Sequence, residues 1–231
     1  MIELRDATVE VPVSDGHLTI LHPTSLELTE RRVSVIGANG SGKSTLARLL
    51  NGLVEPSAGS VQVRGDAGWL DTVGDGAAVR RLVGFAFTDP GAQLVMPTAV
   101  EDVALSLRKQ HRRRSERDAA ALEVLDRFGL AQLAERSVHT LSGGQRQLLA
   151  IASVLATDPA ILVADEPTTL LDLRNSRMIA DLLTSLSQQT IVVTHDLDLA
   201  ARADRTLVVE AGRVVFDGDP AEAIAHYRSL A

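Results

Sequence analysis

A glycine-rich loop between a short strand and a helix restricts the folds open to this sequence more than any other feature does. Residues 37–44 read Gly-Ala-Asn-Gly-Ser-Gly-Lys-Ser and fit the pattern G-x-x-x-x-G-K-[ST]. Residues 32–36 are largely apolar and predict a strand, and the helix after the loop is expected to end at Asn51-Gly52. A strand, glycine loop and helix in this order predict an α/β fold whose loop binds a phosphate.

The spacing inside this loop follows the geometry of a nucleoside triphosphate. Glycines let successive backbone N–H groups turn toward the β-phosphate, and Lys43 reaches the β- and γ-phosphates. Ser44 can bind Mg²⁺ through its hydroxyl. The loop alone leaves both ATP and GTP open. The residues predicted to contact the nucleotide are Gly37, Ala38, Asn39, Gly40, Ser41, Gly42, Lys43, Ser44 and Thr45.

The rest of the chain alternates apolar strands with helices, which favours a mostly parallel sheet. From residue 100 to about residue 157 the spacing is instead helical, with Ala119, Leu122, Leu125 and Phe128 on one face, and we place an inserted helical subdomain at about residues 88–157. Because 231 residues contain no long linker, we predict one domain, 1–231, that includes this helical subdomain. Strands are expected at residues 2–13 (followed by a hairpin turn at 14–16), 25–28, 61–63, 83–87, 161–164, 191–193, 207–209 and 214–216, and later helices at 174–186 and 197–203.

Composition excludes several kinds of function. No stretch approaches the roughly 18–20 apolar residues of a membrane span, and the first residues do not resemble a secretory signal, so a cytoplasmic protein is expected. The absence of cysteine excludes disulfides and thiolate zinc sites. The net charge of -7 argues against broad electrostatic binding to nucleic acid.

Two adjacent carboxylates follow the apolar strand at residues 161–164. Asp165 is expected to hold Mg²⁺, directly or through water, and Glu166 to polarise the water that attacks the γ-phosphate. Neighbouring acids also end many ordinary strands. The pair therefore indicates a nucleotide site only because the glycine loop is also present.

A second candidate phosphate site lies at residues 141–145, which read Leu-Ser-Gly-Gly-Gln. Ser142 can cap the helix that follows, and two glycines leave the first-turn N–H groups free to meet a phosphate. A helix that is merely capped is the alternative interpretation. The residues assigned to this site are Leu141, Ser142, Gly143, Gly144 and Gln145.

The glycine loop, the Leu-Ser-Gly-Gly-Gln motif and the carboxylate strand, in this order, resemble the ABC ATPases, and the resemblance covers essentially the whole chain. It implies hydrolysis of ATP with Mg²⁺, and an α/β domain of ABC type. That domain combines a mostly parallel core sheet, an antiparallel β subdomain and an inserted α-helical subdomain. In this family two subunits sandwich two ATP molecules, so residues 142–144 would contact the γ-phosphate held by the other subunit's Lys43.

The resemblance assigns further residues and also shows departures. Asp172 matches the D-loop aspartate that crosses the dimer interface, and His195 matches the histidine that contacts the γ-phosphate. Thr88 stands where the family has its Q-loop glutamine, so Gln93 is the candidate substitute for contact with Mg²⁺ and water. No aromatic residue precedes Trp69, so aliphatic contact near residues 11–13 is expected to replace adenine stacking.

Residues 88–95 and 98–103 look like the Q-loop segment of the ATPases of energy-coupling-factor importers, and residues 165–172 are similar to the biotin-transporter ATPase subunit. The resemblance implies transmembrane energy-coupling and substrate-binding subunits as partners, a second ABC ATPase subunit, identical or different, and no nucleic acid. It also implies a position at the cytoplasmic face of the cell membrane.

Other functions remain open at this point. The alternatives are an importer for cobalt or nickel or for another vitamin, an ABC ATPase that acts on DNA or ribosomes, and a regulator that binds nucleotide without turnover. The basic run at residues 108–114 is most simply a solvated helix end, and contact with phospholipid or nucleic acid is its alternative.

Overall fold

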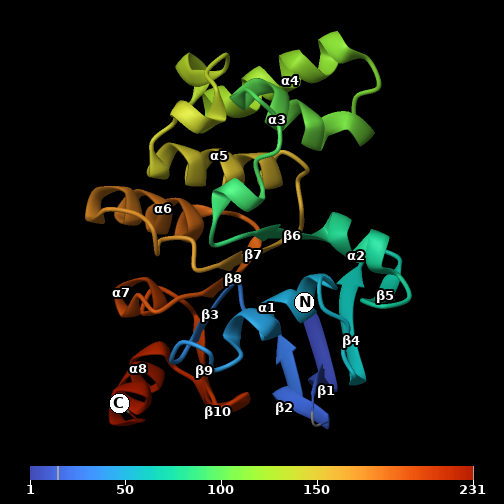
Figure 1. The fold of residues 1–231 in the computed structure, drawn as a ribbon, viewed down its shortest axis with the longest axis vertical. Coiled ribbons are helices and arrows are strands. Elements are labelled where there is room, and N and C mark those ends of the chain that lie inside the picture. The colour runs from blue at the N-terminus through green and yellow to red at the C-terminus, as the bar shows by residue number, and fades with distance from the viewer. Residues whose placement is uncertain (15, 231) are drawn as a thin grey trace.

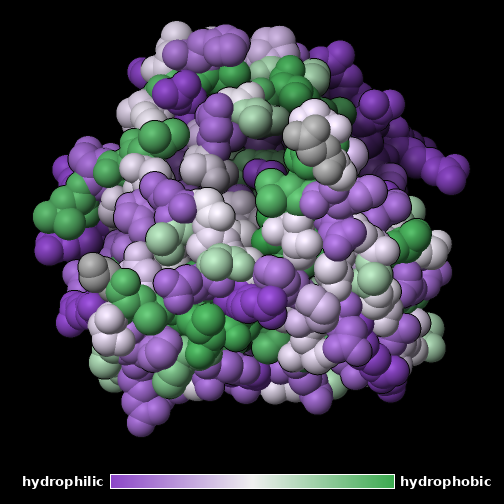
Figure 2. All heavy atoms as spheres, turned by 60° about the horizontal axis from the view of Figure 1, so that its bottom comes forward, coloured by the Kyte–Doolittle hydropathy of each residue, from purple (hydrophilic) through white to green (hydrophobic). Residues whose placement is uncertain are grey.

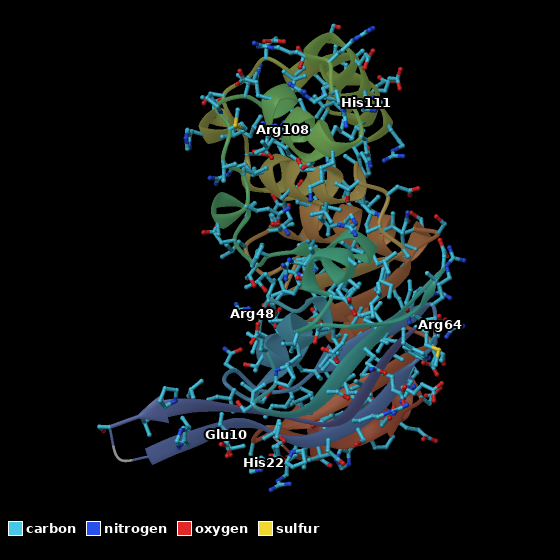
Figure 3. The ribbon with its side chains drawn as sticks, turned by 90° about the vertical axis from the view of Figure 1, so that its right-hand side faces the viewer. Glu10, His22, Arg48, Arg64, Arg108 and His111 are labelled. Atoms are coloured by element: carbon cyan, nitrogen blue, oxygen red, sulfur yellow. The ribbon has the colours of Figure 1, made fainter. Side chains whose placement is uncertain are left out.

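The computed structural model describes residues 1–14 and 16–230 and contains two sheets with a helix between them (Figure 1). The smaller sheet is antiparallel, with the strand order β2-β1-β4-β5. Its strands β1 and β2 form a hairpin that extends away from the rest of the molecule (Figure 3). The turn predicted between them includes Asp15, which lies outside the described residues. The strands are β1 (Ile2–Val13), β2 (Gly16–Leu28), β4 (Ala58–Gly65) and β5 (Gly68–Asp71).

The larger sheet has six strands in the order β10-β9-β3-β8-β7-β6. All neighbouring pairs are parallel except β10 and β9. Because β3, β8 and β7 run in the same direction side by side, their carboxyl ends meet at one edge, where open α/β sheets bind their ligands. The strands are β3 (Arg32–Ile36), β6 (Val83–Ala86), β7 (Ile161–Asp165), β8 (Gln189–Val193), β9 (Arg205–Glu210) and β10 (Arg213–Gly218).

Helix α1 (Lys43–Asn51) lies between the sheets, and its Leu46, Leu49 and Leu50 are fully buried in a core shared with both. The helical part above the larger sheet consists of α3 (Ala99–Ser106), α4 (Arg114–Arg127) and α5 (Gly143–Leu155), and its apolar residues form one core with Leu162 and Ala164 of β7 (Figure 1). The other helices are α2 (Gly76–Leu82), α6 (Leu173–Ser185), α7 (Leu197–Ala200) and α8 (Pro220–Leu230).

The structure confirms a strand at each place where the sequence predicts one, although β2 begins at Gly16, well before the predicted start. The sequence did not predict β5, α2 or α8. The predicted face of α4 is partly wrong, because Ala119 and Leu122 are exposed whereas Ala121 and Leu125 are buried. The mostly parallel core sheet, the antiparallel sheet and the inserted helices are as predicted.

The surface is mixed in polarity. Figure 2 shows hydrophobic residues on one face as separate groups surrounded by polar ones. Within residues 1–14 and 16–230, no helix is both long enough and apolar enough to pass through a bilayer.

Candidate functional site

The glycine loop leaves the end of β3 and enters α1 at Lys43. A Cβ atom at Gly37 would lie 2.1 Å from the carbonyl oxygen of Val209, so no side chain fits there. Gly40 and Gly42 have φ values of 77° and 103°, which residues with a side chain rarely adopt. The loop therefore requires glycine at these three positions to keep its shape.

Lys43 folds back over the loop. Its Nζ donates hydrogen bonds of 2.8 Å to the carbonyl oxygens of Gly37 and Ala38. Burial lowers the pKa of Lys43, and the carboxylates of Glu166 and Asp165 oppose this effect. The ammonium group is thus held inside the loop, close to two carboxylates, where an anionic phosphate would be a favourable partner.

Ser44 and Asp165 meet at the edge of the sheet. The Ser44 hydroxyl donates to Asp165 Oδ1 at 2.9 Å, and Arg48 Nη2 lies 3.8 Å from Asp165 Oδ2. The Asp165 side chain is only 1% exposed. Burial raises its pKa, although the Ser44 hydrogen bond and the Arg48 charge lower it. The structure thus brings two oxygen ligands of the kind that Mg²⁺ prefers to one point.

Glu166 and His195 are in direct contact. Glu166 Oε2 accepts a hydrogen bond of 2.9 Å from the Thr169 hydroxyl and lies 2.8 Å from His195 Nδ1. Glu166 also has a φ of 52°, a left-handed conformation that is uncommon for a residue with a side chain. Backbone strain of this kind costs free energy and is concentrated at active sites. The neighbouring strand ends thus place a carboxylate and an imidazole together.

The Leu-Ser-Gly-Gly-Gln segment begins α5. The Ser142 hydroxyl accepts from Gln145 N at 3.3 Å, and Gln145 Oε1 accepts from Ser142 N at 2.9 Å, which together form a capping box. The helix start lies above α6, in the helical part of the molecule, whereas the glycine loop lies beside β3 and β9 (Figure 1). The structure does not bring these two phosphate-binding motifs together within one chain.

Two other predicted site residues have structural partners. Gln93 receives a hydrogen bond of 3.2 Å from Phe87 N and donates one of 2.8 Å to the Ala150 carbonyl oxygen. Both ends of its amide are therefore engaged with backbone groups of this chain. Asp172 caps α6 by accepting from Asn175 N at 2.8 Å.

Thr169 contacts the carboxylate of Glu166, and Arg48 lies near that of Asp165. No sequence motif predicted these contacts for either residue. Each lies a short distance along the chain from a residue that was predicted, Glu166 and Lys43 respectively. A Thr three residues after an acid at a strand end is a signal for such a bond, because one turn brings the two side chains together. The base contact predicted near residues 11–13 has exposed aliphatic side chains available at Val11 and Val13.

Comparison with known proteins is consistent with this geometry. The family model described as "ABC transporter" matches residues 21–169. The chain is 44% identical to the biotin transport ATP-binding protein of Rhizobium etli, over 95% of this chain and 96% of that protein. It is 40% identical to an energy-coupling factor transporter ATP-binding protein of Lactiplantibacillus plantarum, over 100% and 83% of the two chains. A dimeric ATP-binding cassette solved in a post-hydrolysis state with ADP and Pi is 31% identical, with a TM-score of 0.83 over 95% of this chain and 99% of that one.

Proposed function

The chain belongs to the ABC transporter family of ATP-binding proteins, and we propose that it is the ATP-hydrolysing motor subunit of an energy-coupling-factor importer for biotin. The observation that carries this proposal is the similarity to the biotin transport ATP-binding protein of Rhizobium etli, because it extends over nearly the full length of both chains. The relative from Lactiplantibacillus plantarum supports the energy-coupling-factor branch.

Each residue around the glycine loop has a separate role in the proposed reaction. Lys43 and the loop N–H groups bind the β- and γ-phosphates and offset their charge. Glu166 takes the proton of the attacking water as general base, and Thr169 orients its carboxylate. His195, whose Nδ1 lies 2.8 Å from the Glu166 carboxylate, would contact the γ-phosphate. The reaction converts ATP and water to ADP and phosphate.

Ser44 and Asp165 would hold Mg²⁺. Their oxygens lie 2.9 Å apart beside the loop, and both are hard ligands suited to this ion. The described residues contain no group of three or more His, Cys, Asp or Glu side chains able to hold a metal. Mg²⁺ usually takes its remaining ligands from substrate phosphates and water, so two protein oxygens suffice. The bound ion would neutralise phosphate charge.

Because the glycine loop and residues 142–144 are separated within one chain, we infer that the protein acts as a dimer. Each ATP would be bound by the loop of one subunit and by residues 142–144 of a second ABC ATPase subunit, and Asp172 would lie at this interface. We assign residues 88–157 to the subdomain that carries the second motif within a single domain, 1–231. Gln93, whose amide is engaged with Phe87 and Ala150, would serve the Q-loop by fixing its shape.

The membrane partners would bind beside the Q-loop. A hollow of about 290 Å³ lies there, lined in part by Arg80, Gln93, Val95 and Asp102. One or two side chains of a short helix of the transmembrane energy-coupling subunit would enter this hollow, and the substrate-binding subunit would carry the vitamin. This arrangement places the chain at the cytoplasmic face of the membrane, held there by its partners.

The test is uptake of labelled biotin by cells of the source organism in which the chromosomal gene carries Glu166→Gln. We expect energy-dependent uptake to be lost, and we expect the control Glu222→Gln, which removes a carboxylate on α8, to leave it intact. Normal biotin uptake together with loss of cobalt or nickel uptake, or of the uptake of another vitamin, would overturn biotin as the cargo but not the importer function. Normal uptake of all these compounds would overturn the importer itself.

A further inference from the structure

Seven cationic side chains gather around α2, the turn Leu107–Lys109 and the start of α4. We call this surface the basic face. All of its members are exposed, although the chain as a whole carries a net charge of -7. Figure 3 shows that Arg108 and His111, which belongs to the same run, lie in the helical part of the molecule, far from Arg64 on the β part. The basic face consists of Arg80, Arg81, Arg108, Lys109, Arg112, Arg113 and Arg114.

The basic face encloses a hollow of about 640 Å³ between α2 and the Leu107–Lys109 turn. Four cations line it, namely Arg80, Arg81, Arg108 and Lys109, and among the residues that the structure describes no Asp or Glu does. The remaining lining is uncharged and includes the side chain of Leu105. Four positive charges around a partly apolar hollow form a receptacle for an anionic group that has apolar chain next to it.

The protein itself does little to neutralise these charges. Within residues 1–14 and 16–230, no salt bridge reaches Arg80, Arg81, Arg108, Lys109 or Arg112. The pairs of Arg113 with Glu116 and of Arg114 with Asp118 are 3.5 Å long and involve arginines that are 82% and 80% exposed. Such exposed pairs contribute little. Arg108 also lines a second hollow, together with Glu101 and Asp118, and there the Glu101 carboxylate accepts a hydrogen bond from Thr98.

The position of this surface favours a membrane as its partner. The hollow shares Arg80, Leu105, Ser106 and Thr157 with the hollow assigned above to the transmembrane partner. If that assignment holds, the basic face is turned toward the bilayer beside the partner. Clusters of four to eight Lys and Arg next to a membrane bind anionic lipids. Nucleic acid fits less well, because no aromatic side chain that could stack on a base lines the hollow.

We propose that the basic face binds the phosphate headgroups of anionic phospholipids and so helps to seat the ATPase on the membrane. The inference takes its orientation from the proposed importer function. Its test does not need that function, because the purified full-length chain can be mixed with vesicles in the absence of any transport partner.

The experiment is co-sedimentation of the chain with vesicles of phosphatidylcholine alone or of phosphatidylcholine mixed with phosphatidylglycerol. We expect binding only to the anionic vesicles, weakening as salt is raised. The triple variant Arg81→Gln, Arg108→Gln, Lys109→Gln should bind on the order of 100-fold more weakly, since each cation near such a surface strengthens binding by about fivefold. The matched control Arg64→Gln, Arg177→Gln, Arg228→Gln removes the same charge elsewhere and should bind nearly as well as the unaltered chain.

Equal loss in both triple variants would overturn the proposal, because net charge rather than the basic face would then control binding. Absence of binding to anionic vesicles would also overturn it, as would a preference for a single-stranded RNA oligonucleotide over those vesicles. In another outcome, vesicle binding is lost only in the basic-face variant while the Glu166→Gln cells take up all the tested compounds normally. This combination would support the lipid proposal and contradict only the importer function.

Discussion

Glu166, which we propose as the general base, is held in place by two neighbouring side chains. Thr169 and His195 both contact Oε2, and the residue adopts a strained φ of 52° at the end of a buried strand. Removing a general base typically lowers a rate by about 10²- to 10⁴-fold. We expect Glu166→Gln to lower ATP hydrolysis by this factor while ATP binding is preserved, because the amide keeps the size of the side chain. Phosphate release and equilibrium nucleotide binding measure the two effects.

Thr169→Val provides the matched control, since it removes one hydrogen bond to Glu166 and leaves the carboxylate. A smaller loss of rate is expected. If Glu166→Gln hydrolysed ATP at the rate of the unaltered protein, Glu166 could not be the base.

Asp165 shows the cost of burying a charge. Burial raises the pKa of this carboxyl, although Ser44 and Arg48 oppose the effect. The unfolded chain therefore loses the proton at a lower pH than the folded chain does, and stability falls as the pH rises from the unfolded pKa through the folded pKa. Without nucleotide or divalent cations, Asp165→Asn should raise the Tm at neutral pH by a few degrees, and the gain should vanish in acid. A lowered Tm at neutral pH would show that the contacts of Ser44 and Arg48 outweigh burial.

The starts of α5 and α6 are packed against each other through one side chain. A Cβ atom at Gly144 would lie 2.4 Å from Asn175 Cγ, and Asn175 Nδ2 donates to Asp172 Oδ2 at 3.0 Å. Gly144→Ala should therefore destabilise the chain by about 1–3 kcal/mol, as overpacking does. Combining it with Asn175→Ala should recover part of this loss, and denaturant unfolding of the four proteins gives the coupling. Strictly additive effects would mean that the two residues do not compete for space.

Element prediction succeeded where one physical signal dominated. The strands at residues 32–36 and 161–164 are nearly continuous apolar runs that end at a glycine loop and at two acids, so their positions were predictable. The face of α4 was misassigned because the residues chosen, from Ala119 to Phe128, recur every three positions, a spacing that drifts around a helix of 3.6 residues per turn. The buried pair Ala121 and Leu125 has the spacing of four that stays on one face.

Contacts between distant elements account for what the sequence could not provide. Gln93 is polar and lies in the Q-loop, and nothing local indicates that its amide bonds the carbonyl oxygen of Ala150, 57 residues later in the chain. The role of Arg48 beside Asp165 likewise depends on how α1 packs against β7. Motifs therefore predicted which residues are candidates for the nucleotide site, whereas packing determined which neighbours contact them.

At the scale of the whole molecule, the glycine loop and residues 142–144 lie in different parts of one chain, and our proposal is that a second subunit completes each ATP site. Substitutions of Ser142 can separate its role as a helix cap from its proposed contact with phosphate. Asn and Asp both cap helices well, whereas only Asp adds a negative charge. In a Glu166→Gln background with Mg²⁺ and ATP, we expect Ser142→Asn to dimerise and Ser142→Asp to remain monomeric, since its carboxylate would face the partner's γ-phosphate. Light scattering gives the mass of each variant. Equal dimerisation of both variants would mean that Ser142 does not approach the nucleotide of the second subunit.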